Sequence, residues 1–481
     1  MSELGLKNGS DRTGWHPDIQ SRKGPRYRAI ADALQQDMAA GRLQAGQRLP
    51  THRDLAWRLG VTVGTVTRAY VEAERRGLVG GEVGRGTFVR QQMPEFLEPG
   101  EAEMRLHRHD NAIPPGPIEL AGNAPPTPPL ADRIAQAMAS VAEDPDFGEF
   151  LRYRPSQGLE DHARAGADWI ANFGLSVDPA QVIPTNGAQH GMLVAISAAA
   201  GAGETLLTEN LVFFGLKALG RVLGLRLQGV EMDGEGILPD ALEAAIKSTG
   251  SRALYLSPTI QNPTCGILSP ERRQAIAEIC RRHGVTVIED DIYNFLMDEP
   301  VAPVASYLPE QTIYLANLSK PLAPALRVGY VAAPPHLHGG ILTGIRATGV
   351  MVSPLMQEVG ARLIHDGTAL ENGRLVRERA KERQKIVGRH LSDWPLQRQA
   401  ASLHVWLPLP EAWRREAFTA ACLQRGVAVA SGDVFAIGRQ SAPHCVRLSI
   451  TGPRSDAELE AGLDVVRSLL KSDGIVAYQH L

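Results

Sequence analysis

Residues 313–330 read IYLANLSKPLAPALRVGY, and this stretch decides how the rest of the chain is interpreted. Four residues suited to a buried strand lead into a polar turn with Ser319 and Lys320, and Arg327 follows seven residues after the lysine. A lysine at a strand end beside a cation loses its proton readily, and an arginine can bind a phosphate through two hydrogen bonds. A Ser-Lys dipeptide alone is more often an exposed turn, so the neighbouring segments must decide.

The chain from residue 118 onward alternates helical segments with short runs typical of strands. These runs are VIPT (182–185), TLLTE (205–209), LQGVEM (227–232), ALYLSP (253–258), VTVIED (285–290), TIYLAN (312–317) and VGYVAA (328–333). Strands that alternate with helices predict an α/β fold with a mostly parallel central sheet covered on both faces. Such sheets bind ligands at the carboxyl ends of their strands.

Two of these strand ends carry groups that suit a phosphorylated aromatic ligand. After VIPT, a turn with Gly187 opens a helix at Ala188 and Gln189, and backbone N–H groups at a helix start bind phosphate. After TLLTE come Phe213 and Phe214, either of which could stack on an aromatic ring, although adjacent aromatics are more often core residues.

Two further strand ends carry polar groups. Asn262 follows ALYLSP in an Asn-Pro pair that is a candidate for a cis bond, and its side chain can bind a ring hydroxyl. Asp290 ends VTVIED, with Tyr293 three residues later. A buried acid needs a cation, and a protonated pyridine nitrogen is one, whereas Glu289 or Asp291 would be expected to face water. Together with the lysine, these groups are what pyridoxal 5'-phosphate requires.

Composition and charge describe an ordinary globular chain with a basic front end. Of the 481 residues, 43% are hydrophobic and 21% charged, and neither a membrane segment nor a signal peptide is evident, so we expect a cytoplasmic protein. The four cysteines lie far apart, which favours free thiols over a disulfide or metal site. Residues 1–90 contain 15 Lys and Arg against nine Asp and Glu, although the whole chain has a net charge of −3. The front end is therefore the part suited to a polyanion.

The first 90 residues predict three helices followed by a two-stranded wing. Residues 1–22 read as a flexible arm, and a helical pattern runs from Tyr27 to about residue 41. Thr51 can cap a second helix that ends at Gly60, and Thr62 can cap a third that ends at Gly77. The strands of the wing would follow, up to residue 90. The alternative to a DNA-binding domain is a small helical domain whose basic residues are merely solvated. Residues 91–117 read as a linker between domains.

This window, RLPTHRDLAWRLGVTVGTVTRAYVEAERRGLV followed by GRGTFV, resembles the GntR-type winged helix-turn-helix. The resemblance implies a double-stranded DNA operator as partner and a DNA-binding domain at residues 23–90. The residues that it assigns to DNA contact are Arg53, Thr62, Thr65, Thr67, Arg85 and Gly86. Val63 and Thr67 depart from the pattern, because some family members have base-reading arginines there.

The rest of the chain, residues 118–481, resembles the fold type I pyridoxal-phosphate enzymes of the aspartate aminotransferase superfamily. The resemblance implies a large subdomain at about 160–360 and a smaller α+β subdomain at about 361–481. It assigns Lys320 to the Schiff base, Asp290 to the pyridine nitrogen, Arg447 in HCVRLSI to a substrate carboxylate, and Tyr153 in YRPSQG to the cofactor phosphate of a neighbouring subunit. The further cofactor-binding residues that it implies are Tyr293, Asn262, Phe213, Gly187, Ala188, Gln189, Ser319 and Arg327. Two departures, Cys265 and Asn317, remove no essential group.

A winged helix fused to an aminotransferase-like domain resembles the MocR subfamily of GntR regulators. That resemblance implies a transcriptional regulator that senses an amine, an amino acid or pyridoxal 5'-phosphate itself, acting as a head-to-tail homodimer with no or vestigial transaminase activity. The alternatives are an active pyridoxal-phosphate-dependent aminotransferase with an accessory DNA-binding domain and, less favoured, a DNA binder without an effector. The effector, the target genes, and activation or repression are not specified by the sequence.

Overall fold

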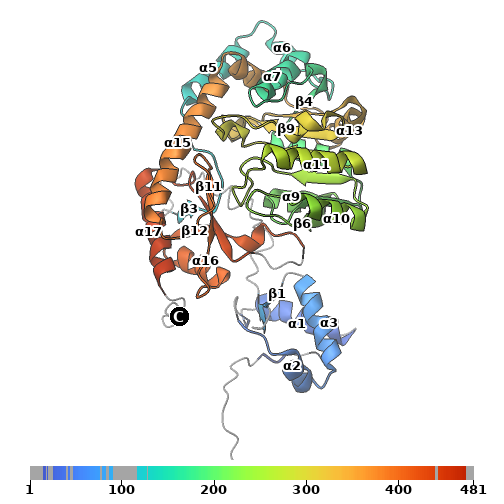
Figure 1. The fold of residues 1–481 in the computed structure, drawn as a ribbon, viewed down its shortest axis with the longest axis vertical. Helices are drawn as coiled ribbons and strands as arrows, with labels where there is room; N and C mark the ends of the chain where they lie inside the picture. The colour runs from blue at the N-terminus through green and yellow to red at the C-terminus, as the bar shows by residue number, and fades with distance from the viewer. Residues whose placement is uncertain are drawn as a thin grey trace, which may run out of the picture. The chain divides into compact units, whose positions relative to one another are not determined.

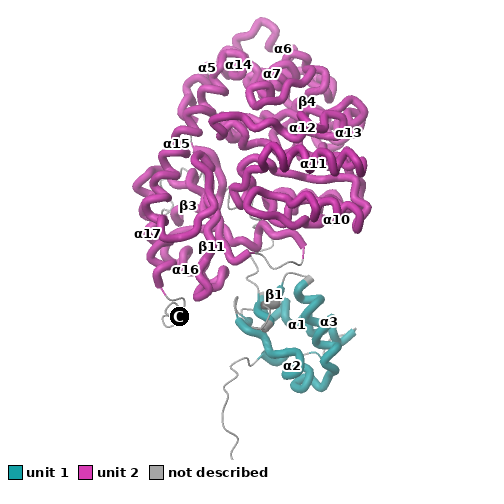
Figure 2. The backbone as a smooth tube through the Cα atoms, in the orientation of Figure 1, with its two compact units in different colours: residues 1–98 teal, residues 99–481 magenta. Residues whose placement is uncertain are grey.

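The computed structural model divides the chain into two compact units, residues 1–98 and 99–481 (Figure 2). The residues described are 15–17, 19, 25–39, 42–43, 47–75, 78–82, 86–89, 116–126, 128–438 and 443–472. The predicted linker, residues 91–117, lies outside them except for its last two residues. None of the helices within these ranges is long and apolar enough to cross a bilayer.

The first unit contains the predicted helices and the two strands of the wing. Its elements are α1 (Arg26–Ala39), α2 (His52–Leu59), α3 (Val63–Arg75), β1 (Val79–Glu82) and β2 (Gly86–Val89), with β1 antiparallel to β2. Thr51 caps α2 by accepting a hydrogen bond from the Asp54 N–H at 3.2 Å, and Gly60 ends it with a left-handed φ of 62°. Thr62 accepts from the Thr65 N–H in the same way. The predicted caps at Thr51, Gly60 and Thr62 are therefore confirmed, whereas Gly77, the predicted end of the third helix, lies outside the described residues.

The front arm is not loose throughout, which corrects our expectation for residues 1–22. Trp15 and Ile19 are buried in the core of the first unit, together with residues of α1 and α3. The indole of Trp15 donates a hydrogen bond to Asp37 Oδ2 at 2.7 Å. Single apolar residues in a polar segment give no periodic signal, so the sequence did not indicate this packing.

All seven strand-like runs form one sheet in the second unit. The strands are β4 (Val182–Thr185), β5 (Thr205–Glu209), β6 (Arg226–Val230), β7 (Ala253–Leu256), β8 (Thr286–Asp290), β9 (Thr312–Asn317) and β10 (Gly329–Ala332). Their order is β4-β10-β9-β8-β7-β5-β6. Only β10 pairs antiparallel with its neighbours in this sheet, so six strands run in one direction, as predicted.

Helices cover both faces of this sheet (Figure 1). On β9, Ile313 and Leu315 pack against α8, α9 and α13, whereas Tyr314 and Ala316 pack against α5, α7 and α14. This alternation follows from the two-residue period of a strand. The helices are α5 (Ala131–Ala142), α6 (Phe147–Phe150), α7 (Glu160–Ala171), α8 (Ala188–Ala199), α9 (Phe214–Val222), α10 (Pro239–Thr249), α11 (Pro270–His283), α12 (Val304–Tyr307), α13 (His338–Gly349) and α14 (Pro354–His365).

A smaller subdomain is built on a four-stranded sheet of order β11-β13-β12-β3. Its elements are β11 (His404–Pro408), β12 (Val427–Ser431), β13 (Cys445–Ser449), β3 (Ile118–Leu120), α16 (Arg415–Gln424) and α17 (Asp456–Lys471), and the long helix α15 (Thr368–His390) packs beside α17. Our predicted bounds of about 361–481 omit β3, which pairs parallel with β12 (Figure 1). The chain therefore enters this subdomain directly after the predicted linker, before it builds the large sheet.

Candidate functional site

The strand order brings the predicted reactive groups to one edge of the large sheet. Strands β9, β8, β7 and β5 are consecutive neighbours and parallel, so their carboxyl ends lie side by side. Lys320 follows β9, Asp290 ends β8, Asn262 follows β7 and Phe213 follows β5. Four groups that are far apart in the sequence thus come from adjacent strand ends.

Asp290 is a buried carboxylate with one uncommitted oxygen. Its side chain is 5% exposed, and the hydroxyl of Tyr255 donates to Oδ2 at 2.5 Å. Oδ1 is buried and accepts no hydrogen bond from any residue that the structure describes. Burial and, more weakly, the charge of Asp291 raise the pKa of Asp290 to about 6, while the Tyr255 hydrogen bond, the Ile292 backbone N–H and the charge of Lys320 act to lower it. A cationic N–H donor placed at Oδ1 would complete this site.

Lys320 and Tyr293 share a partner that the sequence did not indicate, Asn123. The Lys320 ammonium donates to the main-chain oxygen of Asn123, and the amide of Asn123 donates to the Tyr293 hydroxyl at 2.8 Å. The Asn262–Pro263 bond is cis, as considered from the sequence. Because residues 121–124 connect β3 to the large subdomain, this segment links the small sheet to the reactive lysine.

The start of α8 faces Arg327. Gly187 has a φ of 78°, and a Cβ at this position would lie 2.9 Å from Arg327 Nη2. The same nitrogen donates to the main-chain oxygen of Asn186 at 3.1 Å. The positive φ favours glycine here, and any larger residue would also push the Arg327 guanidinium away from the start of α8. The guanidinium lies at a helix N-terminus, where a phosphate is stabilised by charge and by backbone N–H groups.

The remaining predicted cofactor residues lie around this end. Ala188 and Gln189 form the first turn of α8, and the Gln189 amide donates to the Gly215 oxygen at 3.3 Å. Ser319 Oγ is buried with no partner among the described residues. The ring of Phe213 lies over Gly215, since a Cβ there would be 2.2 Å from the ring. Phe213 is half-buried, so part of its ring stays accessible to an aromatic ligand.

Arg447 is buried beneath this site, with 1% of its surface exposed. Its Nη1 donates to Asn262 Oδ1 at 2.8 Å, and its Nη2 donates to the main-chain oxygen of Ala121. Its guanidinium lies 4.8 Å from the centre of the Phe435 ring. A substrate or effector carboxylate that displaced the Ala121 main-chain oxygen would meet the Arg447 guanidinium, a cation that is already desolvated and held in position.

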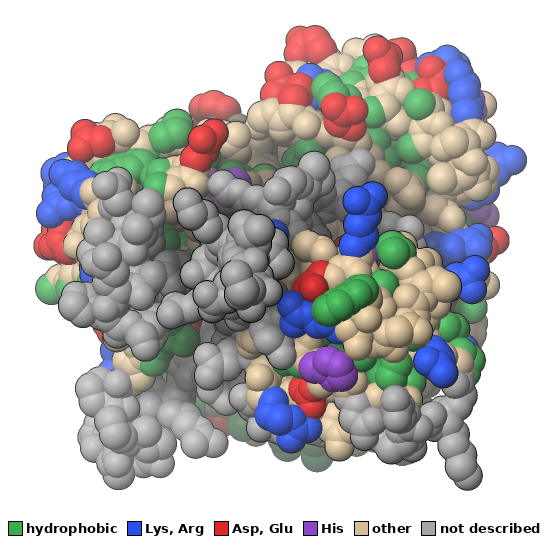
Figure 3. Space-filling view, turned by 90° about the horizontal axis from the view of Figure 1, so that it is seen from below, with side chains coloured by type: hydrophobic (Ala, Val, Ile, Leu, Met, Phe, Trp, Pro, Cys, Tyr) green, Lys and Arg blue, Asp and Glu red, His purple; other side chains and the backbone are tan. Residues whose placement is uncertain are grey.

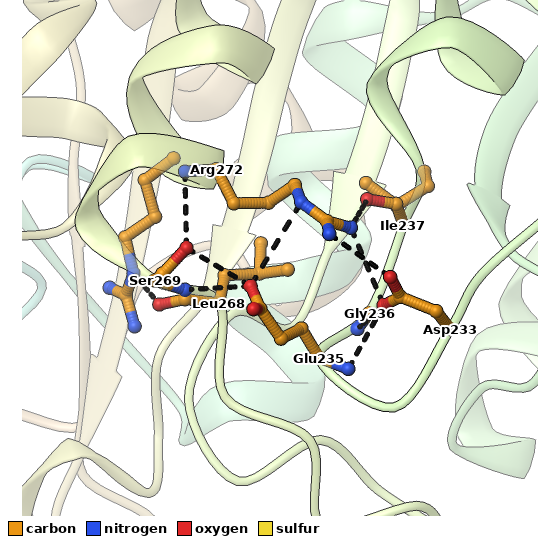
Figure 4. Close-up of polar contacts among 8 residues, drawn as sticks. Asp233, Glu235, Gly236, Ile237, Leu268, Ser269 and Arg272 are labelled. Atoms are coloured by element: carbon orange, nitrogen blue, oxygen red, sulfur yellow. Dashed lines mark hydrogen bonds and ion pairs between the residues drawn. The ribbon is translucent and has the colours of Figure 1, made fainter.

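A network of polar contacts holds the loop that carries Asn262 (Figure 4). Arg272 donates from Nη2 to Asp233 Oδ2 at 3.0 Å, and Ser269 donates from Oγ to Glu235 Oε2 at 3.0 Å. Asp233 and Glu235 belong to a turn closed by an isolated bridge between Met232 and Ile237. Ser269 also caps α11, so the C-terminal end of the Asn262 loop is fixed by both elements.

Tyr255, Asn123 and His404 contribute to the site but were not predicted. Tyr255 lies inside the strand ALYL, where an aromatic residue reads as core, and Asn123 has no motif around it. His404 is buried between Asn123, 3.3 Å from its amide, and the main-chain oxygen of Gln261 at 3.2 Å. The one signal that could have identified His404 is a polar residue at a strand position where the sequence pattern predicts burial, because a buried polar group needs a partner.

We predict that His404 makes folding pH-dependent. Burial first, and then the charge of Arg447, lower the pKa of His404 to about 3. An unfolded histidine has a pKa of about 6.5, so below this value the unfolded chain binds more protons and the folded state loses stability. Between pH 8 and pH 5 the wild type should lose about 2 kcal/mol more than His404→Gln. Urea unfolding of both proteins at each pH measures this difference, and an equal loss in both would contradict the assignment.

Tyr153 and three of the predicted DNA contacts are exposed. Tyr153 is 85% exposed, unlike the buried groups at the sheet edge. On the first unit, Arg53, Thr62 and Thr67 are exposed and Thr65 is half-buried. Gly86 begins β2, and Arg85 lies outside the described residues. The roles assigned to these residues stay predictions.

The buried groups at the sheet edge fit pyridoxal 5'-phosphate. Among the described residues, Asp290 Oδ1 has no donor of the kind that a ring nitrogen would supply, and the buried Ser319 Oγ, next to Lys320 in the chain, has no partner. The Gly187 backbone at the start of α8 lies so close to Arg327 that a Cβ there would be 2.9 Å from the guanidinium, which brings a cation to the exposed N–H groups of this helix. The set combines an amine, an anion site and a buried acid, which are the three requirements of this cofactor.

Comparisons with known proteins agree with both halves of this description. The family described as aminotransferase class I and II matches residues 115–466, and the bacterial regulatory proteins of the gntR family match residues 26–89. The HTH-type transcriptional regulator YdeF of Bacillus subtilis is 28% identical over 456 residues, which cover 95% of this chain and 96% of YdeF. The HTH-type pyridoxine biosynthesis transcriptional regulator PdxR of Corynebacterium glutamicum is 28% identical over 76% of this chain and 79% of PdxR.

Among solved structures, an archaeal alanine:glyoxylate aminotransferase matches with a TM-score of 0.70 at 23% identity. The match covers 84% of this chain and 99% of the aminotransferase. At this identity the likeness establishes the fold of the second unit.

Proposed function

We propose that this chain senses an amine or amino acid at its pyridoxal 5'-phosphate site. The chain belongs to the aminotransferase class I and II family, and its GntR domain makes it a regulator of the MocR subfamily. The chain is a DNA-binding transcriptional regulator, and pyridoxal 5'-phosphate is its cofactor. Its full-length relatives YdeF and PdxR are named as regulators, which favours this function over that of an aminotransferase with an accessory domain. The name of PdxR also makes the cofactor itself a candidate effector.

The observation that carries the proposal is the uncommitted, buried Oδ1 of Asp290 in the same site as Lys320. When bound, the cofactor supplies an aldehyde that reacts reversibly with amines. Lys320 would hold it covalently, Asp290 would bind its ring nitrogen, and Tyr293 and Asn262 would bind its ring oxygen. Arg327, with Ser319 and the first turn of α8, would hold its phosphate.

Residues 121–124 provide a route from the effector to the DNA-binding domain. The carbonyl groups of Ala121 and Asn123 accept hydrogen bonds from Arg447 and Lys320. The carboxylate of an amino-acid effector would compete with the Ala121 carbonyl group for Arg447. Its amine would take the place of Lys320 on the cofactor, and so change what the Asn123 carbonyl group binds. Because this segment follows β3 and the linker, its displacement would change the anchor point of the DNA-binding domain.

The proposed assembly is a cytoplasmic, head-to-tail homodimer. Tyr153 supports it, because a tyrosine that is 85% exposed in one chain is free to reach the cofactor phosphate of a partner. Two DNA-binding domains in one dimer would contact two operator half-sites, and the effector would alter their spacing.

The test titrates amino acids, and matched amines that lack the carboxylate, into the full-length protein with bound cofactor. Visible absorbance reports reaction at the cofactor, and fluorescence anisotropy reports affinity for duplexes enriched from a random pool. We expect an amino acid to change both signals in the wild type. Arg447→Gln should lose the preference for the amino acid over the matched amine, because the buried guanidinium binds the carboxylate.

A change of absorbance without any change in DNA affinity would contradict the coupling. Sustained conversion of an amino donor and a keto acceptor would instead identify a working aminotransferase. Arg346→Gln serves as the matched control, because this arginine lies in the last turn of α13 and is exposed.

A further inference from the structure

The exposed face of helix α3 carries methyl groups where it is expected to meet DNA. Val63, in the first turn, is 45% exposed, and Thr67, four residues on, is exposed as well. Residues four apart lie on the same side of a helix, one turn from each other. Figure 3 shows hydrophobic and basic side chains beside one another on the face of the molecule seen from below.

The hydroxyl groups of this turn are occupied within the protein. Thr67 Oγ1 donates to the main-chain oxygen of Val63 at 3.0 Å and lies 3.4 Å from His52 Nδ1. Since its hydroxyl is engaged within the protein, the γ-methyl group is the part of this exposed side chain that remains for a partner. Thr62 Oγ1 lies 2.9 Å from Thr65 Oγ1 and also accepts from the Thr65 N–H. The side chains best placed to enter a groove are therefore apolar at their tips.

The backbone can approach a partner closely at the same turn. Gly64 follows Val63, and a Cβ built there would meet only Thr62 Oγ1, at 3.9 Å. Arg68 is exposed and is turned by about 100° from Thr67, so it adds positive charge beside the methyl pair. An apolar pair flanked by positive charge suits a polyanion that displays methyl groups, and in the major groove only thymine does so.

We propose that Val63 and Thr67 read thymine 5-methyl groups in the major groove and thereby select T·A pairs in the operator half-site. This inference rests on the DNA-binding part of the proposed function. In the winged helix-turn-helix the second helix of the motif, here α3, enters the major groove, and its N-terminal residues contact base edges. Burial of one methyl group changes affinity by about fourfold, which is the expected contribution of each contact.

The experiment uses the full-length protein and duplexes enriched from a random pool. Each thymine of an enriched site is replaced in turn by deoxyuridine, which removes only the 5-methyl group. We expect one or two positions in each half-site at which the wild type binds about fourfold more weakly. Val63→Ala and Thr67→Ser should bind the thymine duplex more weakly by a similar factor and should each lose the deoxyuridine effect at one position.

Thr67→Ser is the decisive variant, because it deletes the methyl group and retains the hydroxyl that bonds to Val63. Val222→Ala, at a 75% exposed valine of α9 in the other unit, should leave binding and the deoxyuridine effect unchanged. Enrichment without any deoxyuridine effect, or an effect that persists in both variants, would overturn this inference and leave DNA binding intact. Failure to enrich any duplex would overturn DNA binding itself, and with it this inference.

Discussion

Lys320→Ala is expected to abolish covalent binding of pyridoxal 5'-phosphate. Lys320 follows β9 at the sheet edge, where its ammonium group donates to the oxygen of Asn123 and lies in the field of the buried Asp290. Alanine removes the amine and leaves the strand and the phosphate end unchanged, so the variant should still bind the cofactor weakly through noncovalent contacts. After borohydride treatment, mass spectrometry should find the cofactor on the wild-type peptide that contains Lys320 and on none from the variant.

Lys247→Ala is the matched control for this substitution. Its side chain is 62% exposed on α10, and its ammonium group forms an ion pair with Glu243 at 3.2 Å. The control should retain borohydride-stable cofactor on Lys320 at the wild-type level. Cofactor fixed on a different lysine of the wild type, or fixed undiminished in Lys320→Ala, would show that another amine forms the covalent bond.

The large sheet and much of the site follow from local sequence patterns. Each of the seven runs is short, apolar and bounded by turn residues, and each forms a strand. Because parallel strands end at the same edge, residues that follow different runs were expected to lie together, and Lys320, Asp290 and Asn262 follow adjacent strands. The caps at Thr51 and Thr62 were predicted for the same reason, since a capping contact spans three residues.

The contacts that the sequence did not indicate join segments that are distant along the chain. Asn123 meets Tyr293 across 170 residues and Lys320 across 197 residues. The parallel pairing of β3 with β12 is similarly distant, and three residues are too few for a periodic pattern. Such contacts depend on how the two subdomains pack, which no local pattern encodes.

The hydroxyl of Tyr255 shows how buried polar groups escape sequence analysis. Tyr255 is 1% exposed, and its position in the strand ALYL is that of a core residue. Its partner Asp290 lies 35 residues away on the neighbouring strand β8. The sequence therefore predicts the acid that needs a partner, whereas the strand pairing determines which residue supplies the hydrogen bond.

Asp290→Asn is expected to weaken binding of pyridoxal 5'-phosphate by about two orders of magnitude, which corresponds to about 3 kcal/mol. Asparagine keeps the size of the side chain but removes the charge that stabilises a protonated ring nitrogen in a buried site. Asparagine also has one side-chain oxygen where aspartate has two. It therefore could not accept hydrogen bonds from both the Tyr255 hydroxyl and the ring nitrogen, as the two oxygens of Asp290 would. The measurement is a titration of the cofactor-free protein with pyridoxal 5'-phosphate, followed by visible absorbance.

The adjacent Asp291 separates loss of the cofactor from loss of the fold. Asp291 and Glu289 are also buried, so our expectation that one of them would face water was wrong. Asp291 Oδ2 accepts from Asn294 Nδ2 at 2.7 Å and from the Tyr314 hydroxyl at 2.9 Å, so its role is to join β8 to its surroundings. Asp291→Asn should lower the free energy of unfolding, because it alters two buried hydrogen bonds, and should change cofactor affinity far less than Asp290→Asn does. Equal losses of affinity in the two variants would mean that Asp290 acts through packing and not through its charge. A selective loss in Asp290→Asn, with wild-type stability, would assign that charge to the ring nitrogen.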